Sequence, residues 1–213
     1  MNLQNYYYYF TSVLSPKFCD ELIAYGKQQQ EQLALTGNIN KKDLSKNPLS
    51  KKEIKDLKKK RNSNIAWLSE EWIYKEIRPY INIANKKANW NFDWNWSESC
   101  QFTKYGPDQY YGWHCDSWEF PFDDVNNPNK HGKIRKLSVT CSLSDPSDYK
   151  GGELEFNFNN PEKNKKDNIK KCTEILPRGS IVVFPSFVWH RVCPVEEGTR
   201  YSLVIWNLGY PFR

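Results

Sequence analysis

The sequence predicts a mainly β (α+β) protein whose core is a jelly roll or a similar double-sheet barrel, supported by N-terminal helices. The chain holds 9 Trp, 13 Tyr and 11 Phe among its 213 residues, and aromatic side chains favour strands over helical bundles. Helical patterns occur only in residues 1–96, whereas residues 97–213 contain short strand-like runs separated by turn residues. The length fits a single domain over residues 1–213.

The N-terminal part is predicted to contain one strand and two helices. Residues 5–13 (NYYYYFTSV) are aromatic and β-branched, which is typical of a strand. Ser15-Pro16 supplies an N-cap and a first-turn proline for a helix that runs to about Gln30. A second helix begins at residues 69–71 (SEE), and Pro79 is expected to kink or split it. Its apolar positions are predicted to form the buried side: Trp72, Ile73, Ile77, Ile81 and Ala84.

Eight strands are predicted in the C-terminal part, bounded by turn residues such as Gly106-Pro107-Asp108 and Gly151-Gly152. They cover residues 99–105, 109–115, 134–144, 152–158, 173–176, 180–185, 189–194 and 199–207. Two polar insertions, 117–133 and 159–171, interrupt them. Eight strands at this spacing are typical of a double-sheet barrel.

The net charge of +6 is concentrated in one segment. Residues 41–61 contain ten Lys and Arg against three Asp and Glu. We interpret this segment, with the residues from 36 onward, as a solvated and poorly ordered loop or helix. The alternative is a basic rim that attracts an acidic peptide or a nucleic-acid backbone, or a lid over the substrate.

The cysteines and the apolar runs indicate the cellular setting. Six cysteines are scattered without a CxxC pair, which predicts neither a zinc knuckle nor a disulfide framework. The default expectation is therefore a reduced, cytoplasmic protein. No apolar run reaches the length of a membrane span, and the N-terminus lacks the features of a secretory signal, so we expect no membrane partner.

A candidate metal site lies in YGPDQYYGWHCD (residues 105–116) and in the distant segment 188–206. His114 and Asp116 are two residues apart on a predicted strand, so both side chains point to the same face. With His190, they form the two-histidine, one-carboxylate set of non-haem Fe(II) oxygenases. Zinc accepts the same ligands, although zinc hydrolases usually present them on an HExxH helix, which is absent from this sequence. The third histidine, His131, lies in a polar insertion and is interpreted as a surface residue.

Arg200 follows His190 by ten residues on a predicted strand, and Ser202, Val204 and Trp206 share its face. A guanidinium and a hydroxyl in this arrangement can hold one carboxylate of a dicarboxylate cosubstrate. Tyr105 is a candidate for a further hydrogen bond to that cosubstrate.

Two runs carry a family resemblance: RKLSVTCSLSDPSDYKGGELEF (135–156) and ILPRGSIVVFPSFVWHRVCPVEEGTRYSLVIW (175–206). Residues 97–207 resemble the Fe(II)/2-oxoglutarate dioxygenases of the prolyl hydroxylase superfamily, and among them the PKHD-type hydroxylases. The resemblance implies a double-stranded β-helix, with the metal ligands, the cosubstrate residues and a family tyrosine at matching positions. The metal ligands are His114, Asp116 and His190; the cosubstrate residues are Arg200, Tyr105, Ser202 and Trp206.

The resemblance also implies an activity. Fe(II), 2-oxoglutarate and O2 would be required, with ascorbate as reductant, and succinate and CO2 would be released. The expected target is a prolyl residue of a peptide or protein, bound in a groove walled by Tyr111, Trp113 and Trp118. Three alternatives stay open. They are an oxidative nucleic-acid demethylase of the same superfamily, a non-enzymatic jelly-roll binding module, and a zinc hydrolase on this scaffold.

Overall fold

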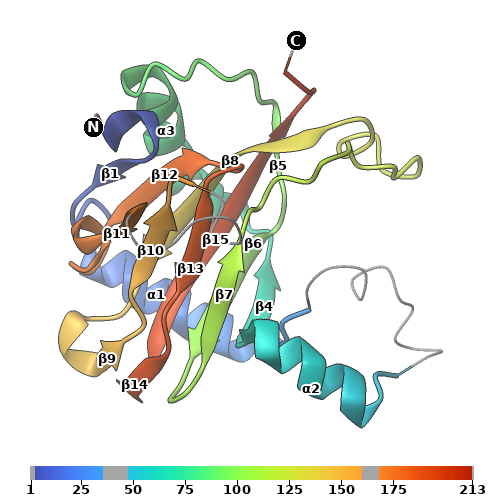
Figure 1. Cartoon of the computed structure of the whole chain (residues 1–213). Coiled ribbons are helices and arrows are strands. Elements are labelled where there is room, and N and C mark those ends of the chain that lie inside the picture. The colour runs from blue at the N-terminus through green and yellow to red at the C-terminus, as the bar shows by residue number, and fades with distance from the viewer. Residues whose placement is uncertain (1–2, 36–47, 160–167, 213) are drawn as a thin grey trace.

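The computed structural model describes residues 3–35, 48–159 and 168–212. In these ranges two helices, α1 (Pro16–Gln28) and α3 (Glu71–Lys87), pack on one face of a large antiparallel sheet, and a smaller antiparallel sheet covers the other face (Figure 1). The predicted fold class, a double-stranded β-helix core with supporting helices, is confirmed.

The larger sheet joins strands from both ends of the chain, and all its pairs are antiparallel. Its order is β1 (Tyr8–Phe10), β12 (Ile181–Pro185), β8 (Ile134–Ser142), β15 (Arg200–Gly209), β6 (Cys100–Tyr105), β4 (Asn64–Leu68) and β2 (Gln32–Leu33), with β5 (Trp96–Ser97) also paired to β15. The longest strands, β8 and β15, lie at its centre, so they carry most of the residues that face the second sheet.

The smaller sheet carries the candidate metal site. Its order is β11 (Ile169–Lys171), β10 (Leu154–Asn157), β13 (Trp189–Val192), β7 (Tyr110–His114) and β3 (Arg61–Asn62). A separate pair, β9 (Tyr149–Gly151) and β14 (Val195–Gly198), extends beyond it. The remaining elements are α2 (Lys51–Lys60) and the 3-10 helices Leu3–Asn5, Pro146–Asp148 and Thr173–Ile175.

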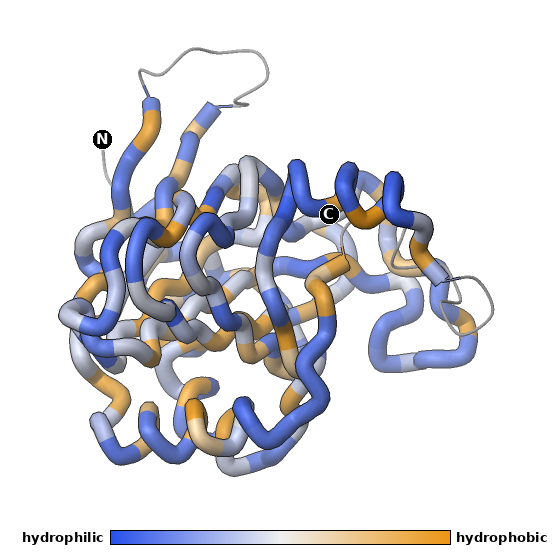
Figure 2. The backbone as a smooth tube through the Cα atoms, turned by 90° about the horizontal axis from the view of Figure 1, so that it is seen from below, coloured by the Kyte–Doolittle hydropathy of each residue, from blue (hydrophilic) through white to orange (hydrophobic). Residues whose placement is uncertain are grey.

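The two faces of the larger sheet differ in polarity because the side chains of a strand alternate. The face toward α1 and α3 is apolar, with Leu137, Val139 and Cys141 of β8 in the core beside both helices. Towards the smaller sheet, β8 instead presents Ser138, Thr140 and Ser142, which are also buried. Figure 2 shows hydrophobic and hydrophilic residues interspersed along the backbone. These hydroxyl groups of β8 lie on the same side of the larger sheet as a second apolar cluster that includes Phe156 and Phe184.

Both predicted supporting helices are present. Ser15 caps α1 by accepting a hydrogen bond from the Phe18 amide, as its position before Pro16 predicts. The second helix continues through Pro79 as one element, so it is not split there. Its buried residues include Ile73, Ile77, Ile81 and Ala84 as predicted, but Trp72 is 37% exposed, which corrects the predicted buried side.

Several strand predictions need correction. In place of the predicted strand 173–176, Thr173–Ile175 form a 3-10 helix, and Ile175 is buried in the core. The N-terminal strand covers only Tyr8–Phe10, since Ser12 adopts a positive φ of 52° that ends it. The strand β4, which pairs with β6 of the larger sheet, was not predicted from the sequence.

The lysine-rich segment is partly ordered. Its residues 41–47 lie outside the described ranges, but Lys51–Lys60 form α2, which begins with a reciprocal capping box between Ser50 and Glu53. The prediction of a poorly ordered segment is therefore wrong for this part. Among the described helices, none is long and apolar enough to cross a membrane.

Candidate metal and cosubstrate site

Three predicted metal ligands converge in the smaller sheet. His114 at the end of β7 lies directly opposite His190 on β13, and Asp116 follows β7 by two residues. The Nε2 of His114 is 3.7 Å from Asp116 Oδ1, and the Nε2 of His190 is 3.5 Å from Asp116 Oδ2. All three ligand atoms lie within 4.8 Å of one another. The spacing leaves room for one ion that all three side chains can reach.

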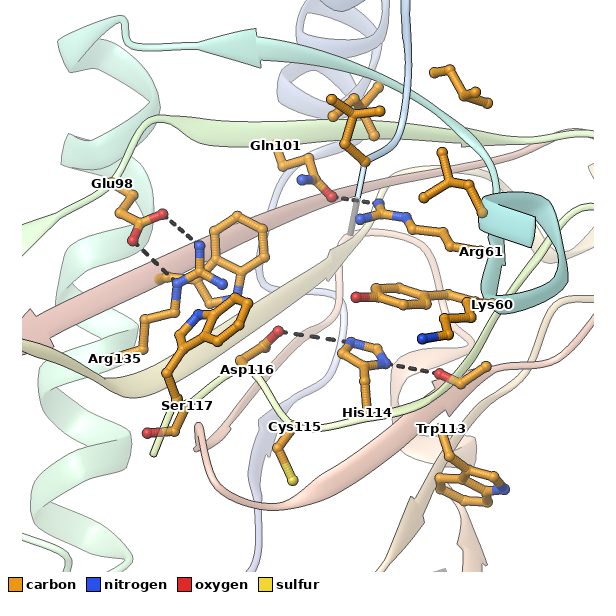
Figure 3. Close-up of a pocket in the computed structure, with 18 of the residues that line it drawn as sticks. Lys60, Arg61, Glu98, Gln101, Trp113, His114, Cys115, Asp116, Ser117 and Arg135 are labelled. Atoms are coloured by element: carbon orange, nitrogen blue, oxygen red, sulfur yellow. Dashed lines mark hydrogen bonds and ion pairs between the residues drawn. The ribbon is translucent and has the colours of Figure 1, made fainter. Parts of the chain in front are cut away.

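Backbone carbonyls orient both imidazoles. Nδ1 of His114 lies 2.9 Å from the Gly112 carbonyl (Figure 3). Nδ1 of His190 lies 3.0 Å from the Val188 carbonyl. A carbonyl oxygen only accepts, so Nδ1 is the protonated nitrogen in each ring, and the lone pair of each Nε2 faces Asp116. A hydrogen bond from the ring nitrogen that does not bind the metal fixes the tautomer of a metal-binding histidine.

The electrostatic environment keeps the set in the charge state that a metal needs. Burial, together with neighbouring His190, holds the pKa of His114 well below 6.5, so the imidazole is neutral at pH 7. Burial raises the pKa of Asp116, but His190, His114 and Arg135 outweigh it together with a hydrogen bond from Ser138, and the net pKa is lowered. The site therefore offers the neutral imidazole of His114 and the carboxylate of Asp116.

Cys115, between His114 and Asp116, does not join the set. Its thiol donates a hydrogen bond to the Phe187 carbonyl at 3.2 Å, and it points away from His114 in Figure 3. Burial raises its pKa to about 12, so it is a protonated thiol at neutral pH. Together with the histidine tautomers, this leaves a nitrogen and oxygen donor set without sulfur, which suits Fe(II) or Zn2+.

Arg200, the first residue of β15, is buried with 2% exposure. It pairs with Tyr105 across β15 and β6, its guanidinium carbon is 5.6 Å from the Tyr105 ring centroid, and its Nη1 donates to Ser202 Oγ at 3.3 Å. Gly152 leaves space for it, since a Cβ there would lie 2.9 Å from Arg200 Cδ.

No carboxylate of the described residues forms an ion pair with Arg200. The acid that feels its charge, Glu153, is paired with Lys171 at 2.7 Å instead. A buried charge without a partner is costly, so the position calls for an anionic ligand.

A cavity of about 1290 Å3 opens beside the triad. His114 and Asp116 line it, whereas Arg200, Tyr105 and Ser202 lie outside its lining. Trp206 also lines it, and its buried indole N–H has no acceptor among the described residues. An orphaned donor beside the triad fits a ligand that carries acceptor oxygens.

The predicted substrate contacts differ in position. Tyr111 stacks on His114, with ring centroids 3.5 Å apart, and burial raises its pKa to about 12. Trp118 is 48% exposed at the cavity wall. Trp113 contributes to the same wall, but its ring stacks under Arg191 and is directed away from Asp116 in Figure 3.

The structure also places residues in the cavity wall that the sequence analysis did not single out. Arg135 donates from Nε and Nη2 to the two carboxylate oxygens of Glu98, at 3.1 and 2.6 Å, and stacks on Trp206 at 3.8 Å. Arg61 occupies the other side of His114 (Figure 3). The sequence carried no signal for the Glu98–Arg135 pair, because its members are 37 residues apart in different elements.

The chain is similar to known proteins over the part that carries this site. A sequence profile of the 2OG-Fe(II) oxygenase superfamily matches residues 100–207, which include all four residues His114, Asp116, His190 and Arg200. A PKHD-type hydroxylase of Synechococcus sp. (strain CC9902) is 41% identical over 101 residues, which are 47% of this chain and 36% of that relative. The match therefore spans little more than a third of that relative.

Solved structures show the same fold. A prolyl-4-hydroxylase of Pseudomonas putida aligns with a TM-score of 0.62 and 18% identity, covering 97% of this chain and 95% of the other. A viral collagen prolyl hydroxylase from Paramecium bursaria Chlorella virus-1, solved as its 2-oxoglutarate complex, aligns with a TM-score of 0.59 and 21% identity, covering 96% of both chains. On the profile match over half its length, this chain belongs to the 2OG-Fe(II) oxygenase superfamily.

Proposed function

We propose that this protein is an Fe(II)- and 2-oxoglutarate-dependent dioxygenase that hydroxylates a prolyl residue in a peptide or protein. The observation that carries the proposal is the buried guanidinium of Arg200, which has no carboxylate partner among the described residues. Arg200 begins β15 of the larger sheet, and the His114, Asp116 and His190 set lies at the smaller sheet that covers it. A dicarboxylate that reached from the metal to Arg200 would supply the missing counter-charge.

Each residue then has a defined task. His114, Asp116 and His190 would hold the iron from one side, and Ser138 would keep the Asp116 carboxylate oriented. Arg200 and Ser202 would bind the distal carboxylate of the cosubstrate, with Tyr105 and Trp206 as further polar contacts. When bound, the iron and 2-oxoglutarate supply the oxidising chemistry, in which decarboxylation to succinate accompanies oxygen insertion into a C–H bond.

The prolyl target is supported by the fold and by the cavity. The two structures compared above are prolyl hydroxylases, and the curated relative is a PKHD-type hydroxylase. The wall of the cavity carries Tyr111, Trp113 and Trp118 in this chain, and aromatic side chains suit an extended proline-rich peptide. Ascorbate as the reductant follows from the same proposal.

The test measures succinate. The purified protein is incubated with Fe(II), ascorbate and 2-oxoglutarate, and succinate formation is compared with and without proline-rich peptides, with mass spectrometry of the peptides for one added oxygen. We expect stimulation by peptides in the wild type and no succinate from His114→Ala. Stimulation by methylated oligonucleotides alone would instead identify a nucleic-acid demethylase.

The non-enzymatic and zinc alternatives have their own readout. Anaerobic addition of Fe(II) and 2-oxoglutarate should produce a weak visible charge-transfer band, which a zinc protein lacks. A sample that binds iron and never consumes 2-oxoglutarate would contradict the proposed activity and favour a binding module.

A further inference from the structure

Lys60 and Arg61 bring a second pair of positive charges to the triad. Both line the cavity that His114 and Asp116 open into, and they lie together on one side of His114 in Figure 3. Arg61 is 4% exposed, and Lys60 is an exposed residue at the C-terminal end of α2. No carboxylate of the described residues forms an ion pair with either.

Each of the other cations of the cavity wall has a carboxylate partner. Arg135 and Lys130 both pair with Glu98, and Lys59 pairs with Asp56 at 2.8 Å. Because Arg135 and Lys130 share the single carboxylate of Glu98, one positive charge remains there, whereas Lys60 and Arg61, on the side of the cavity formed by α2 and β3, have no carboxylate partner among the described residues.

Arg61 is held in a fixed orientation. Its Nε donates to Ser63 Oγ at 2.9 Å, and its Nη2 donates to Gln101 Oε1 at 2.6 Å. Its guanidinium carbon lies 4.3 Å from the centroid of Tyr111, the ring that stacks on His114. These contacts use two of its three nitrogens and one face, which leaves Nη1 available to a ligand.

The strand that carries Arg61 is itself anchored beside the triad. The Tyr110 hydroxyl lies 3.0 Å from the carbonyl oxygens of Lys58 and Lys59 and can donate to either, at the end of α2. Gly112 allows the close approach, since a Cβ there would lie 3.1 Å from the Lys60 carbonyl oxygen. β3 pairs with β7 through Arg61 opposite Tyr111. The position of the two charges thus follows from specific contacts.

We propose that Lys60 and Arg61 form a binding subsite for a carboxylate of the substrate, and that the substrate is a peptide with an acidic residue close to the oxidised residue. The inference rests on the proposed function, because it assigns a role beside the same metal set. Arg61 would contribute Nη1 and Lys60 its ammonium, so that two charge-assisted hydrogen bonds meet one carboxylate. Trp118 and Trp113 in the same wall would contact the neighbouring residues of the peptide.

A peptide accounts for this arrangement better than a nucleic acid does. Arg61 is nearly inaccessible from outside, so it suits one side chain that enters the cavity, whereas a phosphate backbone tracks exposed cations along a surface. The exposed lysines in the first half of α2, Lys51, Lys52 and Lys55, lie outside the cavity lining. A nucleic acid would use those three residues, and an acidic peptide would not need them.

The test compares two fluorescein-labelled pools of proline-centred peptides that differ only in Glu or Gln at the flanking positions. Binding to the full chain is followed by anisotropy with Mn(II) in place of Fe(II), in the presence of 2-oxoglutarate. We expect the Glu pool to bind at least about tenfold tighter, the factor that one charge-assisted hydrogen bond supplies. Lys60→Gln and Arg61→Gln should each reduce this preference. Lys60 is exposed, so its variant remains informative if the Arg61 variant fails to fold.

The matched control is the triple variant Lys51→Gln, Lys52→Gln and Lys55→Gln, which removes more charge from α2 and should keep the Glu preference. Equal binding of the two pools, equal loss in the triple variant, or tighter binding of a labelled single-stranded oligonucleotide would overturn the subsite. A higher 2-oxoglutarate requirement in Arg61→Gln with an intact Glu preference would place Arg61 in the cosubstrate site instead. Succinate formation by the wild type, measured in parallel, separates failure of the subsite from failure of the proposed activity.

Discussion

His114 and His190 are directly opposed residues on β7 and β13, and the centroids of their imidazole rings are 4.1 Å apart. The two residues are 76 positions apart in the chain, so only the pairing of these two strands brings them together. Each ring donates through Nδ1 to a carbonyl two residues earlier on its own chain segment. The metal set is therefore prepared by the backbone of the smaller sheet before any ion binds.

The hydroxyl of Ser138 gives a test of this preparation. It contributes to lowering the pKa of Asp116 and lies 2.8 Å from the Ser186 hydroxyl. Ser138→Ala removes the contact that orients the carboxylate, so we expect metal affinity to fall by about 10–100-fold. Titration with Mn(II) or Fe(II) measures the change. Ser147→Ala, on an exposed turn, is the control, and equal affinity in the Ser138 variant would contradict the orienting role.

The role of Arg200 predicts a selective loss of cosubstrate binding. An ammonium cannot reproduce the planar two-point contact of a guanidinium, so Arg200→Lys should raise the apparent KM for 2-oxoglutarate by about 10–100-fold, the range of one or two weakened charged hydrogen bonds. Succinate formation as a function of 2-oxoglutarate concentration gives the value. The Mn(II) affinity is the control readout, since Arg200 is not a metal ligand. An unchanged KM would show that another group holds the cosubstrate.

Lowered pKa values predict how the metal-free protein responds to acid. The folded protein keeps His114 neutral, whereas the unfolded chain protonates it below about pH 6.5, so the unfolded state binds more protons below that pH. The free energy of unfolding should therefore fall as pH decreases from 6.5, by at most about 1.4 kcal/mol per pH unit for this group, and should not depend on it above 6.5. Asp116 adds its own loss only below its ordinary value of 3.8.

Urea unfolding of chelator-treated protein at several pH values measures this effect. His114→Gln should flatten the slope between pH 6.5 and 5, while His131→Gln, at an exposed position, should retain it. A slope that is identical in all three proteins would assign the acid sensitivity to other groups.

Gly26 gives a prediction for the fold. A Cβ at this position of α1 would lie 2.6 Å from the ring of Phe102 on β6. Alanine normally stabilises a helix relative to glycine by about 1 kcal/mol. Here we expect Gly26→Ala to destabilise the protein by about 1–3 kcal/mol, because the close packing of α1 on the larger sheet has to open. Denaturant unfolding decides the sign, and a gain in stability would show that Phe102 moves freely.

Much of the fold was predictable because its signals are local. Ser15-Pro16 predicts the start of α1, and the runs 134–144 and 199–207 predict two strands. All three elements are present, as α1, β8 and β15. Two predictions were wrong for physical reasons. The sequence of residues 173–176 is typical of a strand, but no described strand pairs with it. The lysine-rich sequence of α2 indicates a poorly ordered segment, but the capping box of Ser50 and Glu53 begins a helix there.

By itself, the sequence determined which residues carry the candidate chemistry. The HxD spacing of His114 and Asp116 and the late arginine Arg200 are local patterns, although Asp116 lies two residues beyond the end of β7 and not on the strand that the sequence predicts for it. The tertiary structure decided which charges meet. Pairing of β3 with β7 places Arg61 beside His114, and the packing of β8 against the 97–99 segment neutralises Arg135 with Glu98. Whether a buried charge is compensated depends on contacts between residues tens of positions apart, which no short spacing in the chain encodes.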